Sequence, residues 1–491
     1  MQTVLLILVP LFPALCAALC WLCPALDGDK PRNRFVMVSL CASFALTAAL
    51  CLTGDGAVTL FSITPSLPVT LASDSMARLF ALLASAMWLN SGAFSFGYMA
   101  HEGGGKRFYT FYLLTLFAIL GLAFAGTLVT MYLFFELVTL LSVALVLHSM
   151  SKEAVAAGVK YLIYSIAGAM MGLLGIFFFT GASSAPGFVA GGTLTAEAMA
   201  TSGPLLLAVL FVTVVGFGTK AGMFPMHGWL PTAHPIAPAP ASAVLSGVIT
   251  KCGVFCIIRV VYYVAGASFL RGTWAQAALL ALSLATVFMG SMMALKTTGL
   301  KKRLAYSSVS QVSYVLFGLF LLNGVAFRGA LLHMVFHSVM KNALFLCAGG
   351  IILKTGHTDV GDLGGVGKRM PVTLWCFTLA GLGLVGVPPL SGFYSKWQLA
   401  QGALGSGLEV FNWLGPVVLL VSALLTAAYL LPVSIRAFFP ERGDEAASLP
   451  GCELNGRMLA PLIVLTVLTL ILGLCPALVE GVAAAIAGTI L

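Results

Sequence analysis

The sequence is poor in charged residues, above all in acidic ones. Only 8% of its 491 side chains are charged and 16 are Asp or Glu, whereas 60% are hydrophobic. A soluble domain has about 25% charged residues, so this deficit excludes a soluble globular protein. Few carboxylates also disfavour a sodium site built from side chains, because hard cations prefer oxygen ligands, although backbone carbonyls remain available.

Motifs for redox cofactors are lacking as well. The eleven cysteines are scattered, and the one C-x-x-C, Cys20 with Cys23, has no matching pair elsewhere. We interpret them as small buried apolar residues. No G-x-G-x-x-G follows a strand, no cysteines are spaced for an iron–sulfur centre and no axial pair suggests haem. We therefore expect no cofactor and no metal in this chain, and we assign any electron transfer to partners.

Long apolar runs dominate instead. A helix needs about 20 apolar residues to cross a bilayer, and fourteen such runs occur. They lie at 3–26, 34–54, 74–99, 108–126, 127–148, 160–180, 203–223, 236–265, 273–295, 303–323, 327–353, 371–400, 412–437 and 458–480. The first has no basic n-region and no A-x-A-like site, so we expect a retained helix. The sequence predicts an all-α integral membrane protein with about fourteen transmembrane helices in a single polytopic domain, 1–491.

The basic residues behind the net charge of +9 are concentrated in alternate connections between the spans. This distribution argues against nucleic-acid binding. Alternate connections hold most basic residues: Lys30, Arg32, Arg34, Lys106, Arg107, Lys152, Lys160, Lys296, Lys301, Lys302, Arg303, Lys354, Lys368, Arg369, Arg436, Arg442 and Arg457. The other connections hold only Arg271 and Arg328. By the positive-inside rule, and with an even number of helices, both termini are predicted to lie outside the cytoplasm. We expect a multi-pass protein of the cell inner membrane.

Glycine and proline interrupt the seventh and twelfth runs, at residues 216–225 and 386–396. Proline removes a backbone donor and clashes one turn back, so both helices should break there. Interrupted helices at corresponding positions of two halves indicate inverted repeats around a midplane site. We predict two inverted five-helix repeats with broken helices 7 and 12. The expected parts are helices 1–3 in 1–107, helices 4–8 in 108–266, helices 9–13 in 271–437 and helix 14 in 458–491.

Among the charged side chains within these runs, we place five well inside a span: Glu136, Lys220, Lys251, Lys341 and Lys396. Each costs roughly 2.5–3.5 kcal/mol at the centre of a spanning helix, and such residues usually line ion or proton paths. A desolvated lysine can be protonated reversibly, whereas arginine stays charged. These residues therefore predict a proton path, and packing alone would not require them.

For two of the five residues, the sequence leaves two interpretations of their role open. Lys220 is the candidate partner of Glu136, in a pair that opens and closes or, alternatively, in a static ion pair. Lys396 follows the prolines of the second break and either faces the path or extends to the membrane surface, as long basic side chains near helix ends do.

Histidines extend the candidate path. His333, His337 and Lys341 are spaced i, i+4 and i+8 and so form one stripe on a helix. Histidine titrates near neutrality, which favours a proton relay; a metal site is the rival, but no third ligand is evident. His227 and His234, between runs seven and eight, either line a cytoplasmic entrance or are structural.

Arg259 lies eight residues after Lys251, about 80° around the helix axis. The two can share a broad face of the eighth helix. Lys251 is the more central of the two. We assign Lys251 to the path and Arg259 to packing or to a role at the helix end.

The motifs resemble a known family, over nearly the whole chain. They are Lys220 in K-A-G-M-F-P-M-H-G-W-L-P-T-A-H, A-P-A-P-A-S-A running on to Lys251, K-R-L-A-Y-S-S-V-S-Q from Lys302, His333 to Lys341, and Pro388 to Lys396. The chain is similar to the antiporter-like membrane subunits shared by respiratory complex I, Mrp cation/proton antiporters and membrane-bound energy-converting hydrogenases. This resemblance implies membrane-subunit partners and a half-channel for protons.

In that family, the residue matching Glu136 couples to the one matching Lys220. The positions of Lys251 and Lys341 form a central hydrophilic axis there, and the residue matching Lys396 lies toward proton exit. Lysine at 396 looks more like the D-type Mrp subunit and its hydrogenase relatives than like the M-type subunit of complex I, and the N-type subunit can carry it too. The chain ends soon after its fourteenth run, without the lateral helix of the L-type subunit.

The function favoured is thus a proton-translocating, Mrp D-like subunit of a multisubunit complex in the lipid bilayer, moving protons and, if carbonyls bind it, sodium. The alternative is an M- or N-type subunit of NADH-quinone oxidoreductase. A freestanding cation/proton exchanger, a redox enzyme and a passive scaffold are the other classes weighed.

Overall fold

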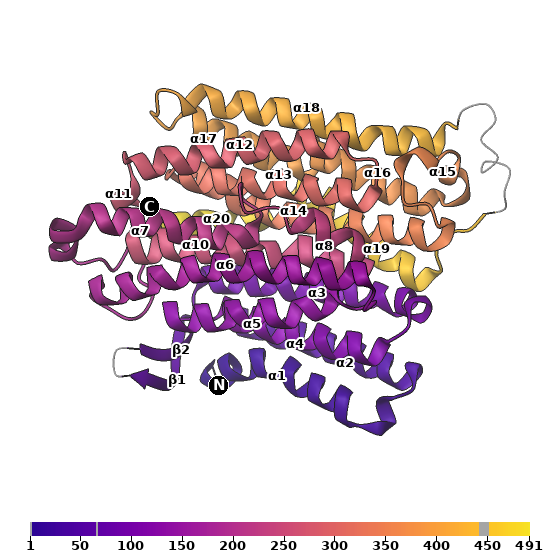
Figure 1. Ribbon diagram of the computed structural model, residues 1–491, viewed down its shortest axis with the longest axis horizontal. Coiled ribbons are helices and arrows are strands. Elements are labelled where there is room, and N and C mark those ends of the chain that lie inside the picture. Colours follow the sequence, from indigo (N-terminus) through magenta and orange to yellow (C-terminus); the bar gives the residue numbers. More distant parts are fainter. Residues whose placement is uncertain (1, 65–66, 441–450) are drawn as a thin grey trace.

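The computed structural model describes residues 2–64, 67–440 and 451–491. Most of its helices lie side by side in one slab (Figure 1). Among the described residues, twelve helices are long and apolar enough to cross a membrane. The predicted class, a helical multi-span membrane protein, is confirmed. Arg442, assigned to the last basic connection, lies outside the described residues.

The elements follow in chain order. The first part contains α1 (Gln2–Leu22), η1 (Pro24–Leu26), α2 (Asp29–Cys51), β1 (Gly56–Thr64), β2 (Leu67–Ser73) and α3 (Ser75–Glu102). Next come α4 (Gly105–Ala123), α5 (Leu128–Val146), α6 (Lys152–Ala182), α7 (Ala196–Ala221), α8 (Leu230–Ile236), α9 (Ala239–Val244), η2 (Leu245–Ile249), α10 (Thr250–Ile258) and η3 (Arg259–Ala265). The remainder contains α11 (Ala267–Leu270), α12 (Trp274–Lys296), α13 (Leu300–Phe320), α14 (Gly324–Thr355), η4 (Val360–Asp362), α15 (Val366–Arg369), α16 (Pro371–Val385), α17 (Ser391–Leu404), α18 (Phe411–Phe438), α19 (Gly456–Leu474) and α20 (Ala477–Ile490).

One element was not predicted. β1 and β2 form an antiparallel hairpin between α2 and α3, with Gly56 opposite Ser73 and Val58 opposite Leu71. The segment is rich in β-branched residues, which favour strands, and it is too short and polar to span a bilayer. At this hairpin the structure departs from the all-α expectation, because hydropathy detects spanning helices and not short paired strands.

Both predicted helix breaks are present. α7 ends at Gly222, whose φ of 82° is left-handed, and α8 starts at Leu230. α16 likewise ends at Gly386, with φ 95°, and α17 starts at Ser391. Glycine adopts this conformation without strain and terminates a helix, and prolines after it prevent continuation.

The last predicted helix is also divided. α19 ends at Leu474, Pro476 follows, and α20 starts at Ala477. Proline has no N–H for the next helical hydrogen bond and its ring crowds the preceding turn, which favours a helix end here. The exact number of fourteen spans and the inverted repeats stay predictions.

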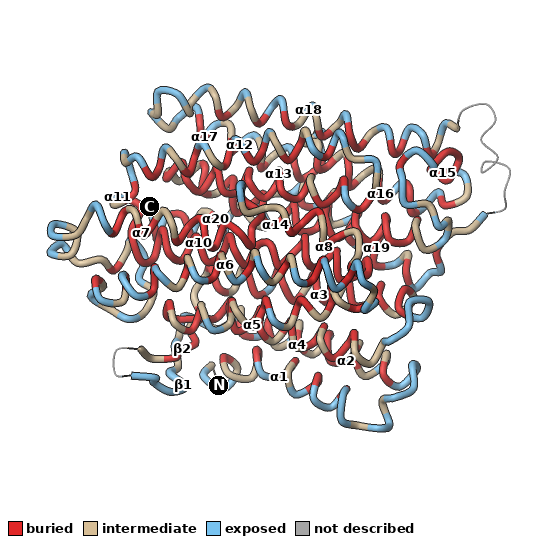
Figure 2. Tube along the Cα trace, viewed as in Figure 1, coloured by how far each residue is buried: buried red, intermediate tan, exposed pale blue. Residues whose placement is uncertain are grey.

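Two elements form the centre of the slab. Ala239–Ala265 is buried throughout and α14 over most of its length, and the central tubes in Figure 2 are correspondingly red. Helices of the first predicted half pack on one another, as do those of the second, and α8, α9 and η2 contact α13 and α14 between the halves. Residues on these elements are thus shielded from lipid.

Candidate functional site

Three of the predicted lysines are completely enclosed. Lys220 is 1% exposed, and Lys251 and Lys341 are 0% exposed. They lie in the last turn of α7, in α10 and in α14, respectively. Lys396, in α17, and Glu136, in α5, are only partly buried. The structure therefore separates the five predicted residues into an enclosed set of three and two flanking groups.

Lys220 is held by hydroxyl groups. Its Nζ donates to Thr139 Oγ1 at 2.6 Å and to the Tyr161 hydroxyl at 3.1 Å. The aromatic rings of Phe135 and Tyr161 lie 5.2 and 5.0 Å from the same Nζ, a distance at which rings attract a cation. The Tyr161 hydroxyl continues to Ser142 Oγ at 2.8 Å. The ammonium group is thus solvated by neutral partners.

Glu136 lies on α5 one turn before Thr139. It is near enough to Lys220 to interact electrostatically, but the four ion pairs of the described residues do not include these two. Its Oε1 is buried without a hydrogen-bond partner. The direct Glu136–Lys220 pair, static or closed, is therefore not formed in this conformation.

Lys251 binds a backbone carbonyl released by a π-helical segment. In η2 the hydrogen bonds skip one more residue than in an α-helix, a geometry that often marks functional sites. Lys251 Nζ donates to the carbonyl of Ser246 in this segment at 2.5 Å. The Ser246 hydroxyl lies 2.7 Å from that of Ser308 on α13. Lys251 thereby adjoins the second half of the molecule.

Lys341 has the same kind of surroundings on the other side. Its Nζ donates to the Leu304 carbonyl at 2.9 Å and to Ser307 Oγ at 2.8 Å. Tyr429 of α18 donates to the same Ser307 hydroxyl at 2.8 Å and to Thr426 Oγ1 at 3.2 Å. A buried series of hydroxyls therefore extends from Lys341 into α18.

The histidine stripe points from Lys341 toward Lys396. His333 Nδ1 lies 2.9 Å from Ser395 Oγ, beside Lys396, and the His333 and His337 rings are 5.9 Å apart. His333 Nε2 and both nitrogens of His337 are buried without a partner. Buried polar atoms nearly always have partners, often water, so water is the expected partner of these three nitrogens.

Lys396 turns inward and does not extend to the surface. Its Nζ donates to the carbonyls of Leu384 at 2.7 Å and Val385 at 3.0 Å, at the end of α16 beside the break. The Tyr314 ring lies 5.0 Å from the same Nζ. Carbonyls at a helix end lack intrahelical donors, so the break itself creates the acceptors for this lysine.

The two remaining histidines, His234 and His227, lie in different environments. His234 is 0% exposed, both ring nitrogens lack partners, and its ring stacks on Phe345 at 4.7 Å. Phe345 also lies 5.9 Å from Lys341 Nζ. His234 therefore adjoins the enclosed lysines. His227 is half-buried and lies 5.9 Å from Phe224 in the α7–α8 break. Only His227 has the accessibility that an entrance needs.

Several polar residues of this site were missed from sequence. They are Thr139, Tyr161, Ser307, Tyr429 and Lys301. Lys301, assigned above to a connection, is buried and donates to the Ala237 carbonyl at 2.9 Å. Hydroxyl residues are common in apolar helices, so only their place beside a lysine distinguishes these. Across the described chain, no group of three or more His, Cys, Asp or Glu could hold a metal.

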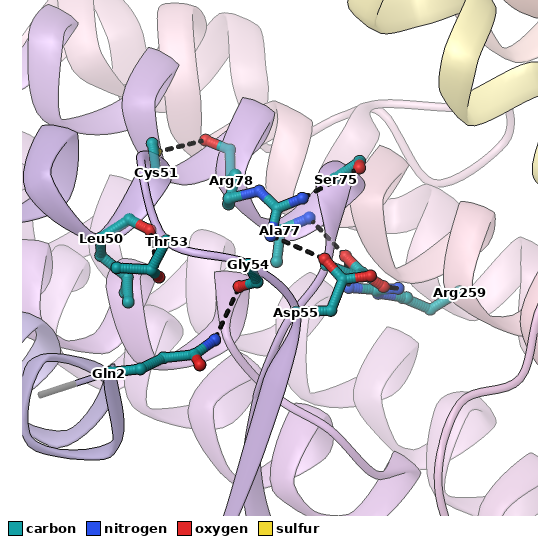
Figure 3. A network of polar contacts seen from close by, with 11 residues as sticks. Gln2, Leu50, Cys51, Thr53, Gly54, Asp55, Ser75, Ala77, Arg78 and Arg259 are labelled. Atoms are coloured by element: carbon teal, nitrogen blue, oxygen red, sulfur yellow. Dashed lines mark hydrogen bonds and ion pairs between the residues drawn. The ribbon is translucent and has the colours of Figure 1, made fainter.

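Arg259 forms the one deeply buried ion pair among the described residues. Its guanidinium donates to Asp74 Oδ2 at 2.5 Å and Oδ1 at 2.9 Å, and three aromatic rings surround it. Asp74 also caps α3 by accepting from the Ala77 N–H at 2.7 Å. Figure 3 shows Arg259 near the exposed pair of Arg78 with Asp55. Arg259 thus has the structural role expected of it.

The carboxyl of Asp74 lies just outside the span of α3, and its pKa is shifted by the groups around it. Burial alone would raise its pKa. The charge of Arg259 and its hydrogen bonds, together with the Ala77 N–H and Arg78, outweigh burial, so the pKa of Asp74 lies below its usual range. The ionised form therefore stabilises the junction of α3 with η3.

The fold and the site together define a polytopic membrane protein with a lipid-shielded series of lysines and histidines between two broken helices. Residues 125–438 match the family described as "NADH:quinone oxidoreductase/Mrp antiporter, TM". The chain belongs to this family, as its motifs indicated.

Relatives and solved structures agree with this membership. The chain is 33% identical over 499 residues to NADH-quinone oxidoreductase subunit N of Desulforudis audaxviator, covering 96% of this chain and 95% of that protein. It is 29% identical over 407 residues to the D-type subunit of the Na(+)/H(+) antiporter of Alkalihalophilus pseudofirmus, covering 82% and 80%. A chain in the structure of the Mrp complex from Dietzia sp. DQ12-45-1b superposes with a TM-score of 0.87 at 21% identity, covering 100% and 97%; that match shows the fold.

Proposed function

We propose that this chain is a proton-translocating, Mrp D-like subunit of a multisubunit membrane complex. Protons would move through Glu136, Lys220, Lys251, Lys341 and Lys396, with His333, His337 and His234 as relays and His227 at an entrance. The complex would lie in the cell inner membrane, with both termini of the chain outside the cytoplasm.

One observation carries the proposal. Among the described residues, the hydrogen-bond partners of Lys220, Lys251 and Lys341 are hydroxyls and carbonyls, and none of the three is in an ion pair. A static buried ammonium would need a carboxylate to offset its desolvation. A lysine held by neutral partners in this way could pass a proton on, whereas an arginine would stay charged.

The alternative parent complex is NADH-quinone oxidoreductase, with the chain as its N-type subunit. The 33% identity to a subunit N over nearly the whole chain favours it, whereas the likeness to the D-type antiporter subunits favours the Mrp type. Either assignment makes the neighbouring subunits integral membrane proteins. Sodium transport would need carbonyl ligands, because carboxylates are few in this chain.

The test is proton pumping by the reconstituted parent complex with Lys220→Ala. Assembly is measured on the same preparations, and Lys302→Ala, at an exposed lysine, is the matched control. We expect the assembled Lys220→Ala complex to lose most proton translocation while the control keeps it. Normal pumping by the assembled Lys220→Ala complex would instead identify a structural subunit.

A further inference from the structure

A large cavity lies outside the lysine series, between α2, α3 and α19. Its volume is about 1400 Å³. α2 and α19 each pack against α3, and the three helices are neighbours in Figure 1. α3 therefore forms the floor of a groove with α2 and α19 as its walls. None of the residues proposed above for proton transfer lines this groove.

The groove has one basic end and one apolar body. Lys30 and Arg34 of α2 and Arg457 of α19 line its end, beside the end of α3. Further along the same helices the lining is apolar, with residues such as Met37, Phe96 and Leu468. None of the described residues that line the groove is an Asp or Glu. A ligand that matches it must carry negative charge at one end and hydrocarbon along the rest.

Lys30 and Arg457 stand at helix N-termini, which disfavour basic side chains, and Arg34 lies one turn further along α2. The positive ends of helix dipoles favour anions and repel cations. All three are exposed, and over residues 2–64, 67–440 and 451–491 they enter no ion pair. A bound anion would offset both the side-chain charges and the two helix dipoles.

A second, independent feature is an unpartnered polar atom. Asn33 Oδ1 is buried, lines the groove beside Arg34 and accepts no hydrogen bond. A buried acceptor without a partner is unfavourable, because it has lost its hydrogen bonds to water. A ligand with a hydroxyl near its negative charge would satisfy it, as the glycerol of a lipid headgroup does.

We propose that this groove binds one anionic phospholipid, with its phosphate among Lys30, Arg34 and Arg457 and its acyl chains along Met37, Phe96 and Leu468. Basic pockets between transmembrane helices recognise such headgroups. A helix from a partner subunit could fill the apolar body. It would also have to place several carboxylates at the same level of the membrane, opposite the three basic side chains. The charge pattern therefore favours lipid over polypeptide. The site is independent of the proposed proton transfer.

The chain offers its own reporter for the test. Cys41 is exposed and lines the groove, whereas Cys475 is exposed outside it. The parent complex, stripped of lipid in detergent, is supplied with phosphatidylglycerol or phosphatidylcholine. The rate of maleimide labelling is then measured at both cysteines, and retained lipid is measured by native mass spectrometry. Cys475 reports any general effect of lipid.

Two sets of variants separate charge from shape. The combined Lys30→Gln, Arg34→Gln and Arg457→Gln variant removes the basic end. Its control, Lys152→Gln with Lys296→Gln and Lys302→Gln, removes as many exposed charges elsewhere. Ala93→Trp fills the apolar body, since Ala93 lines the groove.

We expect phosphatidylglycerol, and not phosphatidylcholine, to slow labelling of Cys41 while Cys475 is unaffected. Removing the basic end should weaken retention about fivefold for each charge, and the control should retain lipid normally. Ala93→Trp should exclude the lipid at unchanged charge. Equal protection by both lipids, retention unaffected by the basic-end variant, or a Cys41 that stays covered in the delipidated complex by a partner polypeptide would each overturn the proposal.

Discussion

Lys220 donates its shortest hydrogen bond, 2.6 Å, to Thr139 Oγ1 and not to Glu136, which precedes Thr139 by three residues on the same helix. Residues three apart lie on one face of a helix, so the hydroxyl occupies the position next to the ammonium and the carboxylate lies one turn away. Lys220 thus has a neutral hydrogen-bond partner in place of the carboxylate with which it was expected to pair.

Thr139→Val should slow proton translocation. Valine keeps the shape of threonine but cannot accept a hydrogen bond from Lys220. A buried donor left without its acceptor costs about 1 to 3 kcal/mol. Pumping per assembled complex, measured with a pH-sensitive dye, should fall about fivefold or more. Thr213→Val is the matched control, because Thr213 Oγ1 bonds only to its own helix at Val209. Equal rates in both variants would mean that Thr139 does not act through Lys220.

Tyr429→Phe should impair the second half of the path. It removes the hydroxyl that donates to Ser307, the acceptor of Lys341. Losing one hydrogen bond of about 1 kcal/mol should lower pumping about fivefold. Tyr262→Phe removes another buried hydroxyl, which donates to the Leu319 carbonyl at 2.5 Å and contacts no lysine. It should reduce the thermal midpoint without reducing pumping by the assembled complex.

Asp74→Asn should destabilise the fold rather than the transport step. It leaves the Arg259 guanidinium buried and unpaired, while asparagine still caps α3. Breaking a buried pair costs about 3 to 5 kcal/mol, and the lower figure applies because Asp74 is partly exposed. Asp55→Asn, which breaks the exposed pair with Arg78, should cost about 1 kcal/mol or less. Thermal unfolding in one detergent compares the two, and equal midpoints would contradict the structural role.

The same carboxylate predicts a pH dependence. The pKa of Asp74 is lowered in the folded protein. The ionised carboxylate therefore contributes fully to the free energy of unfolding at pH values above its pKa in the unfolded chain, about 4. This contribution is lost as pH falls below that value toward the folded pKa. Between about pH 5 and pH 3, the thermal midpoint of wild type should fall more than that of Asp74→Asn. Parallel curves would show that other carboxyls dominate acid unfolding.

Gly253→Ala should disturb the junction at Lys220. A Cβ at Gly253 would lie 2.5 Å from the Phe217 carbonyl oxygen and 2.7 Å from the Ala221 nitrogen. These are backbone atoms, so α10 must move away from α7, at about 1 to 3 kcal/mol. Gly481→Ala, which meets nothing within 4 Å, should be neutral or stabilise α20 slightly. The thermal midpoint and pumping should both fall for the first variant only.

Much of the fold followed from local features. Hydropathy located the spans, and the glycine and proline clusters located the breaks after Ala221 and Val385. The β1–β2 hairpin does not follow from local features, because a strand needs a partner segment. The division at Pro476 does not follow from hydropathy, because the apolar character continues across it.

Prediction of the site was less complete. Lys220, Lys251 and Lys341 were found because a charge inside an apolar run is conspicuous in any sequence. Their acceptors, Thr139 and Ser307, are ordinary residues in such runs and were not found. The rival positions proposed for Lys396 were decided only by the carbonyls that the α16 break exposes.

The sequence by itself determined that the chain is membrane-embedded, where α7 and α16 end, and that Lys220, Lys251 and Lys341 lie inside apolar runs, because each of these depends on composition within a single segment. The tertiary structure alone decided what those groups bind. Lys220 meets Thr139 across 81 positions, and Tyr429 meets Ser307 across 122. Contacts between segments so distant arise from helix packing, which no local pattern specifies.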